Sequence, residues 1–141
     1  MVRTIIGVVV GAVCLGGIVA LLQQVSSAMH PLPPELYPLD PADADGFAEY
    51  LAGMPAGVWL VAMLSEVLGA AIGALMAGVI ARDAPRGASG GVVALAVLAS
   101  AANWTAFAHP VWYIAGQIFL YPVALTGVWA LLAARPRSGT G

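Results

Sequence analysis

The sequence predicts an all-α integral membrane protein, a four-helix bundle whose spans run up-down-up-down. Hydrophobic residues make up 61% of the chain and charged residues only 9%, whereas soluble domains carry about 25% charged residues. The mean hydropathy of +0.93 agrees with this class. Four apolar runs are each long enough for a helical span of about 20 residues, and all the arginines lie on one side of these spans.

The four spans and one long connection account for the whole chain, which we expect to form a single four-span membrane domain over residues 1–141. The expected spans are residues 4–27, 56–81, 89–108 and 111–134, with an outer loop at 28–55. The first run follows Arg3 and precedes Ser-Ser-Ala-Met, so it also resembles a secretory signal peptide with cleavage near Ala28. An uncleaved span is favoured because the run exceeds a usual signal core and because four spans give a consistent topology.

The charges predict the orientation of the chain in the membrane. The basic residues on one side are Arg3, Arg82, Arg86, Arg135 and Arg137. The first loop on the other side carries the acids Glu35, Asp40, Asp43, Asp45 and Glu49. The positive-inside rule then places both termini in the cytoplasm. The single cysteine, Cys14, lies in an apolar run and permits no internal disulfide and no CxxC motif.

The first part of the outer loop is rich in proline, and its second part has a helical pattern of apolar residues. It contains six prolines and opens with a stretch that cannot be helical. Asp40 followed by Pro41 then matches an N-cap with proline at the first helical position. Apolar residues recur after it at helical spacing, opposite Asp45 and Glu49; they are Phe47, Tyr50, Leu51 and Met54. We expect a short amphipathic helix on the outer membrane surface, with a disordered polar loop as the alternative.

A single acid, Glu66, interrupts the second span. At about 1.5 Å per residue it lies roughly 13 to 14 Å from Gly57, near mid-depth in a hydrocarbon core of about 30 Å. An acid at that depth costs about 2.5 to 3.5 kcal/mol, so it should not face lipid. Small residues continue from it at helical steps, namely Gly69, Gly73 and Ala77. The sequence therefore places Glu66 on a face that packs closely against another helix.

Polar residues on the third and fourth spans reach a similar depth. Tyr113, Gln117 and Tyr121 form an i,i+4 stripe on the fourth span, and Ser100 and Asn103 share a face of the third. The predicted intramembrane polar site comprises Glu66, Ser100, Asn103, Gln117 and Tyr121. Pro122 gives no N–H to the carbonyl of Ile118, so a kink or a water is expected there.

Two interpretations of the polar site remain open. Glu66 could be a protonatable carrier site in a pocket open to the outside. It could instead be hydrogen-bonded throughout and specify which helices pack together. Nothing in the sequence shows a route from Glu66 to the cytoplasmic side.

Two further groups of residues have expected roles in packing and at the interface. Gly7 and Gly11 form a GxxxG motif on the first span, so the expected packing residues are Gly7, Gly11, Gly69, Gly73 and Ala77, within the bundle or between protomers. His30 and His109 each precede a proline at the outer surface. Together with Trp112 and Tyr113 they are expected to lie at the lipid headgroups, with a metal site of His30, His109 and nearby acids as the alternative.

Several segments after Ala28 resemble a known group of proteins. They are HPLPP, LDPADADGFAEYLAGMPAG, LGAAIGALMAGVIAR and AANWTAFAHPVWYIAGQIFLYPVAL. In them the chain resembles uncharacterised small bacterial four-span membrane proteins with a proline-rich outer loop, a Gly-rich second span and a Pro-His-Pro-Trp hairpin, whose first proline is Ala108 here. The resemblance implies a bacterial inner-membrane protein and no particular activity. It points to the positions His30, Asp40, Gly69, Gly73, Asn103, His109, Pro110 and Trp112.

The motifs that the sequence lacks limit the functions that can be expected of the protein. The sequence has no phosphate loop, no nucleophile with a base and no nucleic-acid-binding surface, which argues against an enzyme and against cofactors. We expect an accessory or assembly subunit that acts through its Gly-rich packing faces. The alternative is a homo-oligomeric proton- or cation-coupled carrier or channel that uses Glu66.

Small multidrug transporters of similar size also use a membrane glutamate, but theirs lies in the first span. Expected partners are the lipid bilayer and either further copies or a larger membrane complex, without nucleic acid.

Overall fold

The structure is a computed structural model, which describes residues 1–36 and 44–135. Within these residues all regular structure is helical, which confirms the predicted all-α class. The elements are α1 (Val2–Met29), the short 3-10 helix η1 (Pro34–Leu36), α2 (Ala44–Ala52), α3 (Ala56–Ile80), α4 (Pro85–Ala106) and α5 (Val111–Ala133). Helices α1, α3, α4 and α5 are long and apolar enough to cross a membrane. These four helices support the assignment as a membrane protein.

Prolines mark the starts of three of the long helices. Pro55 and Pro110 directly precede α3 and α5, and Pro85 occupies the first turn of α4. Proline suits these positions because the first helical N–H groups have no partner within the helix. Helix α4 therefore begins four residues before the expected span at residue 89. The expected N-cap at Asp40 and Pro41 lies outside the described residues.

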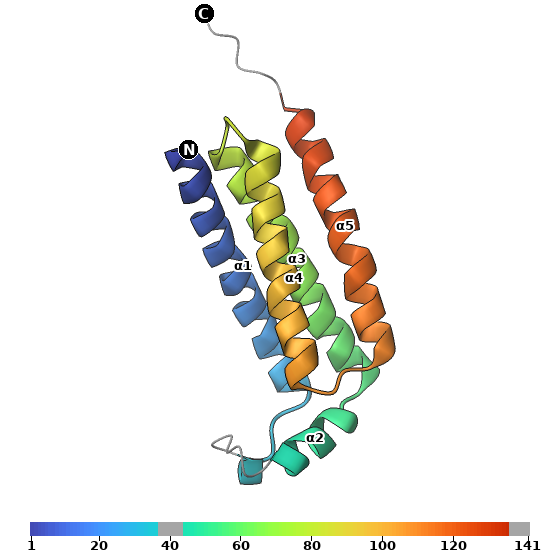
Figure 1. Ribbon diagram of the computed structural model, residues 1–141. Helices are drawn as coiled ribbons and strands as arrows, with labels where there is room; N and C mark the ends of the chain where they lie inside the picture. Colours follow the sequence, from blue (N-terminus) through green and yellow to red (C-terminus); the bar gives the residue numbers. More distant parts are fainter. Residues whose placement is uncertain (37–43, 136–141) are drawn as a thin grey trace, which may run out of the picture.

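Helix α3 is the central element of the bundle. It contacts α1, α4 and α5, and α4 contacts both α1 and α5. Figure 1 shows the amino-terminal end of α1 and the carboxyl-terminal end of α5 at one end of the bundle, with α2 at the other end. The connection between α4 and α5 is short, as expected from His109-Pro110, and lies at the same end as α2.

Helices α1 and α3 approach each other at their glycines. A Cβ atom on Gly11 would lie 2.5 Å from the carbonyl oxygen of Gly73, and one on Gly73 would overlap the carbonyl oxygen of Gly11. Gly7 lies against the carbonyl of Ala77, where an added Cβ would be 2.7 Å away. A Cβ on Gly69 would lie 3.0 Å from a methyl group of Val19. The small residues of the two helices thus pack against one another within a single chain.

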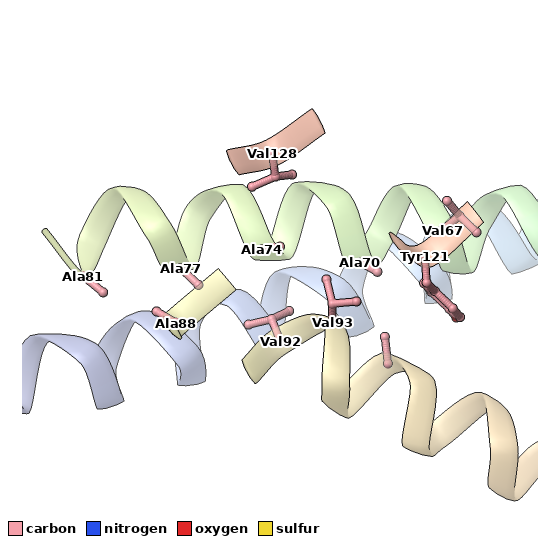
Figure 2. Close-up of a cluster of buried hydrophobic side chains, with 11 residues drawn as sticks. Val67, Ala70, Ala74, Ala77, Ala81, Ala88, Val92, Val93, Tyr121 and Val128 are labelled. Atoms are coloured by element: carbon pink, nitrogen blue, oxygen red, sulfur yellow. The ribbon is translucent and has the colours of Figure 1, made fainter. Parts of the chain in front are cut away.

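Small side chains also fill the end of the bundle near the arginines. Figure 2 shows this cluster, which contains Ala74 and Ala77 of α3, Ala81 directly after α3, and Ala88 and Val92 of α4. All five are fully shielded from solvent. The hydroxyl of Ser89 lies 2.9 Å from the carbonyl oxygen of Ala74 and 2.8 Å from that of Pro85. This half of the bundle is a closely packed apolar core.

Candidate functional site

The carboxylate of Glu66 accepts hydrogen bonds from two neighbouring helices. Glu66 lies ten residues after Ala56, about 15 Å along α3. Its Oε2 atom accepts from the hydroxyl of Ser100 at 2.9 Å and from the amide of Gln117. The hydroxyl of Tyr113 donates to Oε1 at 3.1 Å, and that of Tyr121 lies 3.5 Å from Oε2. All four partners are neutral donors.

The periodicity of α5 positions three of these donors. Tyr113, Gln117 and Tyr121 are spaced by four residues, so they lie on one face of the helix. Their exposed fractions are 1%, 0% and 2%. They also bond to each other and to α4: Gln117 donates to the Tyr113 hydroxyl at 3.2 Å, and the Tyr121 and Ser100 hydroxyls are 2.7 Å apart. The donors are therefore held in place by contacts other than those to Glu66.

The structure brings four of the expected site residues together, namely Glu66, Ser100, Gln117 and Tyr121. Asn103 lies near them, but its amide is 3.4 Å from the Nε2 atom of His109 and makes no bond to Glu66. Tyr113 was expected at the headgroups and is instead buried against Glu66. Its position in the i,i+4 stripe explains the difference, because the stripe faces the bundle along its whole length.

Trp104 was missed by the sequence reasoning. Its indole N–H donates to the side-chain oxygen of Gln117 at 2.8 Å. This bond fixes the orientation of the amide, so that the NH₂ group of Gln117 faces Glu66 and Tyr113. The signal in the sequence was its spacing of four residues from Ser100 on the same helix.

A cavity of about 400 Å³ extends from Glu66 to the end of the bundle that carries α2. Its volume is in the range of small-molecule sites. Its lining includes many aromatic rings, namely those of His30, Phe47, Tyr50, Trp59, Phe107, His109 and Tyr113. The ring centroids of Trp59 lie 5.2 Å from those of both His109 and Tyr113. Glu66 is the only acidic residue among the described lining residues.

A second cavity of about 450 Å³ meets the first at Glu66 and continues between α1 and α4. Leu15, Val19 and Ala96 give it apolar walls. Gln23, Glu66 and Asn103 line both cavities. Gln23 had no expected role, because a glutamine at the end of an apolar run is equally typical of a residue at the membrane surface. Glu66 thus stands at the junction of a space open toward one end of the bundle and a space between two helices.

Of the residues expected at the headgroups, His30, His109 and Tyr113 line the first cavity, whereas Trp112 does not. The ring of His30 stacks on Tyr50 with centroids 4.8 Å apart, and the Tyr50 hydroxyl donates to the His30 carbonyl at 2.8 Å. Burial raises the pKa of Tyr50 above its usual value. Trp112 is 42% exposed. No group of three or more His, Cys, Asp or Glu side chains suited to a metal ion occurs within residues 1–36 and 44–135.

No protein-family model matches the chain, and no curated protein or solved structure matches it. The site must therefore be interpreted from its chemistry. None of the described side chains that hydrogen-bond to Glu66 is cationic. Because Glu66 also borders two cavities, its carboxyl group is accessible to a proton or a small cation.

Proposed function

We propose that the protein is a non-enzymatic, proton- or cation-coupled membrane carrier whose binding site is Glu66. The observation that carries the proposal is the position of the Glu66 carboxylate at the junction of two cavities, bonded only by neutral donors. An acid that served packing alone would be expected to have its charge enclosed by the bundle, with no cavity beside it.

The proposed topology is up-down-up-down with both termini in the cytoplasm of a bacterium and α2 on the outer membrane surface. Arg3, Arg82, Arg86 and Arg135 support it, because positively charged residues favour the cytoplasmic side. In α2, Phe47 and Leu51 are half-buried whereas Asp45 and Glu49 are exposed, as expected for a surface helix. In this orientation the cavity lined by aromatic rings opens to the outside. The likeness to small bacterial four-span proteins agrees with an inner-membrane location.

The hydrogen bonds around Glu66 suit a site that gains and loses a positive charge. Aromatic faces favour cations by their electrostatic quadrupole, so the lining of Trp59 and Tyr113 adds to the attraction of the carboxylate. When a proton or cation neutralises Glu66, Ser100 can keep its bond to Tyr121 and Gln117 its bond to Tyr113. The site can therefore change its charge without leaving every donor unpaired.

The small-residue core beyond Glu66 supports a carrier in an outward-open state. Carriers alternate access by moving helices against one another around a central site. Alanine and glycine surfaces, such as those of Ala74, Ala77 and Gly73, present few side-chain obstacles to such movement. The closed core in Figure 2 would then be the inner gate of this state.

Glu66→Gln is expected to abolish coupled transport while leaving the fold intact, because glutamine retains the shape and an acceptor oxygen but cannot bind or release a proton. The measurement is proton flux into proteoliposomes with an enclosed pH dye, under an imposed gradient of inorganic or organic monovalent cations. Glu49→Gln is the matched control, since Glu49 is exposed on α2. Flux through Glu66→Gln equal to that of the parent would remove Glu66 from the mechanism.

An accessory or assembly subunit is the second candidate function. Its support comes from α1, where an added Cβ on Gly16 or Gly17 would meet no described atom within 4 Å. This small face is free in the single chain. In contrast, Gly11 and Gly73 pack against each other, Gly7 packs against Ala77, and Gly69 packs against Leu15 and Val19. The mass of the intact particle in mild detergent separates the candidates, because a carrier would purify as a homo-oligomer or monomer and a subunit with a larger complex.

A further inference from the structure

A third cavity lies at the end of the bundle opposite α2, apart from the two cavities at Glu66. Its volume is about 500 Å³, and three arginines from different parts of the chain line it. Arg82 belongs to the connection after α3, Arg86 to the first turn of α4, and Arg135 follows the end of α5. All three side chains are exposed. Distant segments of the chain thus bring three arginines to one cavity.

The charge of this cavity is entirely positive in the described part of the chain. None of its described lining residues is acidic. Asp83 adjoins Arg82 in sequence but does not line the cavity. A guanidinium group is a planar donor that binds two oxygens of one phosphate at once. Three such groups around one cavity indicate an anionic ligand with several oxygens.

The backbone of α4 adds donors of the same kind. The helix begins at Pro85 without a side-chain cap, so the N–H groups of Arg86 and Gly87 lack partners within the helix. Both residues line the cavity. Gly87 is exposed, and a Cβ on it would meet no described atom within 4 Å, so no neighbouring side chain crowds this residue. The start of a helix of 22 residues also favours a bound anion through its dipole.

The remaining wall of the cavity is apolar and aromatic. Trp129 and Leu132 of α5 line it beside the arginines. The indole nitrogen of Trp129 is buried and has no hydrogen-bond partner among the described residues. Tryptophan is typical of the level of lipid headgroups in membrane helices. A cavity with a basic rim and an apolar wall fits a ligand that combines a phosphate with an apolar portion.

From these observations we infer that this cavity binds a phosphate group held by Arg82, Arg86 and Arg135 and by the first amides of α4. The phosphate belongs either to the headgroup of an anionic phospholipid or to a soluble phosphate ester. Basic pockets between membrane helices bind anionic headgroups by the same interactions. This site is separate from Glu66 and does not depend on the proposed carrier function.

The test uses the full chain in detergent and counts bound molecules by native mass spectrometry. The probes are dioctanoyl phosphatidylglycerol, dioctanoyl phosphatidylcholine and glycerol 3-phosphate. We expect the anionic lipid to bind at least tenfold more tightly than the zwitterionic lipid. The double variant Arg86→Gln/Arg135→Gln should weaken this binding about tenfold or more, because it removes two charged donors. Arg3→Gln is the matched control, since Arg3 carries the same charge on α1 and does not line the cavity.

The outcomes distinguish the two sources of phosphate. Binding of the anionic lipid alone, lost in the double variant and kept in Arg3→Gln, supports a headgroup site. Equal binding of glycerol 3-phosphate with the same dependence on Arg86 and Arg135 supports a soluble phosphate ester. Absence of binding by both anions overturns the inference. An equal loss in Arg3→Gln also overturns it, because the effect would then reflect general surface charge. Arg82→Gln provides an independent second variant if the double variant does not fold.

Discussion

Gly73→Leu is expected to separate α1 from α3 and to lower the stability of the bundle by about 3 kcal/mol or more. At this position even a Cβ atom would overlap the carbonyl oxygen of Gly11, and Leu15 lies beside it with its Cβ 3.2 Å away. Backbone atoms cannot move aside as a flexible side chain can, so the two helices must part. Thermal unfolding in detergent, followed by circular dichroism, measures the loss.

Gly17→Leu is the matched control for this variant. It introduces the same side chain on the same helix pair, but an added Cβ there would meet no described atom within 4 Å. We expect its unfolding temperature to remain close to that of the parent. If Gly73→Leu unfolded at the same temperature as Gly17→Leu, the close contact of α1 with α3 would not contribute to stability.

Glu66→Leu is expected to lower the stability by about 2 to 3 kcal/mol, because it removes the acceptor that three donor hydrogens share. One belongs to Tyr113 and one to Gln117. The third belongs to whichever hydroxyl of the Ser100 and Tyr121 pair donates to Glu66 rather than to its neighbour. Water in the adjoining cavities can accept hydrogen bonds from some of these donors, which limits the loss of stability. Chemical unfolding in mixed micelles gives the difference in free energy.

Two variants show whether this loss comes from the hydrogen bonds. Glu66→Gln keeps an acceptor oxygen and should recover most of the stability. Glu49→Leu makes the same exchange on the exposed side of α2 and should change the stability by no more than about 0.5 kcal/mol. A Glu66→Leu protein as stable as the parent would contradict the arrangement of donors around the carboxylate.

The helices and the inward position of Glu66 followed from simple properties of the sequence. Length and apolarity identify four candidate spans because a membrane accepts few other structures. The i,i+4 spacing of Tyr113, Gln117 and Tyr121 placed three polar groups on one face, and the only helix with an acid at that depth was α3. Few side chains on other helices could then be hydrogen-bond partners of Glu66.

Other features depend on contacts that no single helix encodes. The start of α4 at Pro85 was missed because the first turn of this helix is rich in glycine and polar residues and has low hydropathy. The contact of Trp104 with Gln117 depends on how α4 rotates relative to α5. The two cavities at Glu66 depend on how the helices are arranged around it, and Gln23, which lines both cavities, belongs to no distinctive sequence pattern. The bonding of Asn103 to His109 is likewise set by the turn between α4 and α5.

The central claim is that Glu66 exchanges a positive charge through the cavity that reaches the α2 end of the bundle. Infrared difference spectroscopy of the protein in lipid vesicles tests this claim directly, because a protonated carboxyl group has a C=O band that a carboxylate lacks. The account predicts a band that forms on acidification, is absent from Glu66→Gln and decreases when a small organic cation is added. A spectrum in which no band that depends on Glu66 changes with pH or cation would contradict the account, because Glu66 would then hold one charge state throughout.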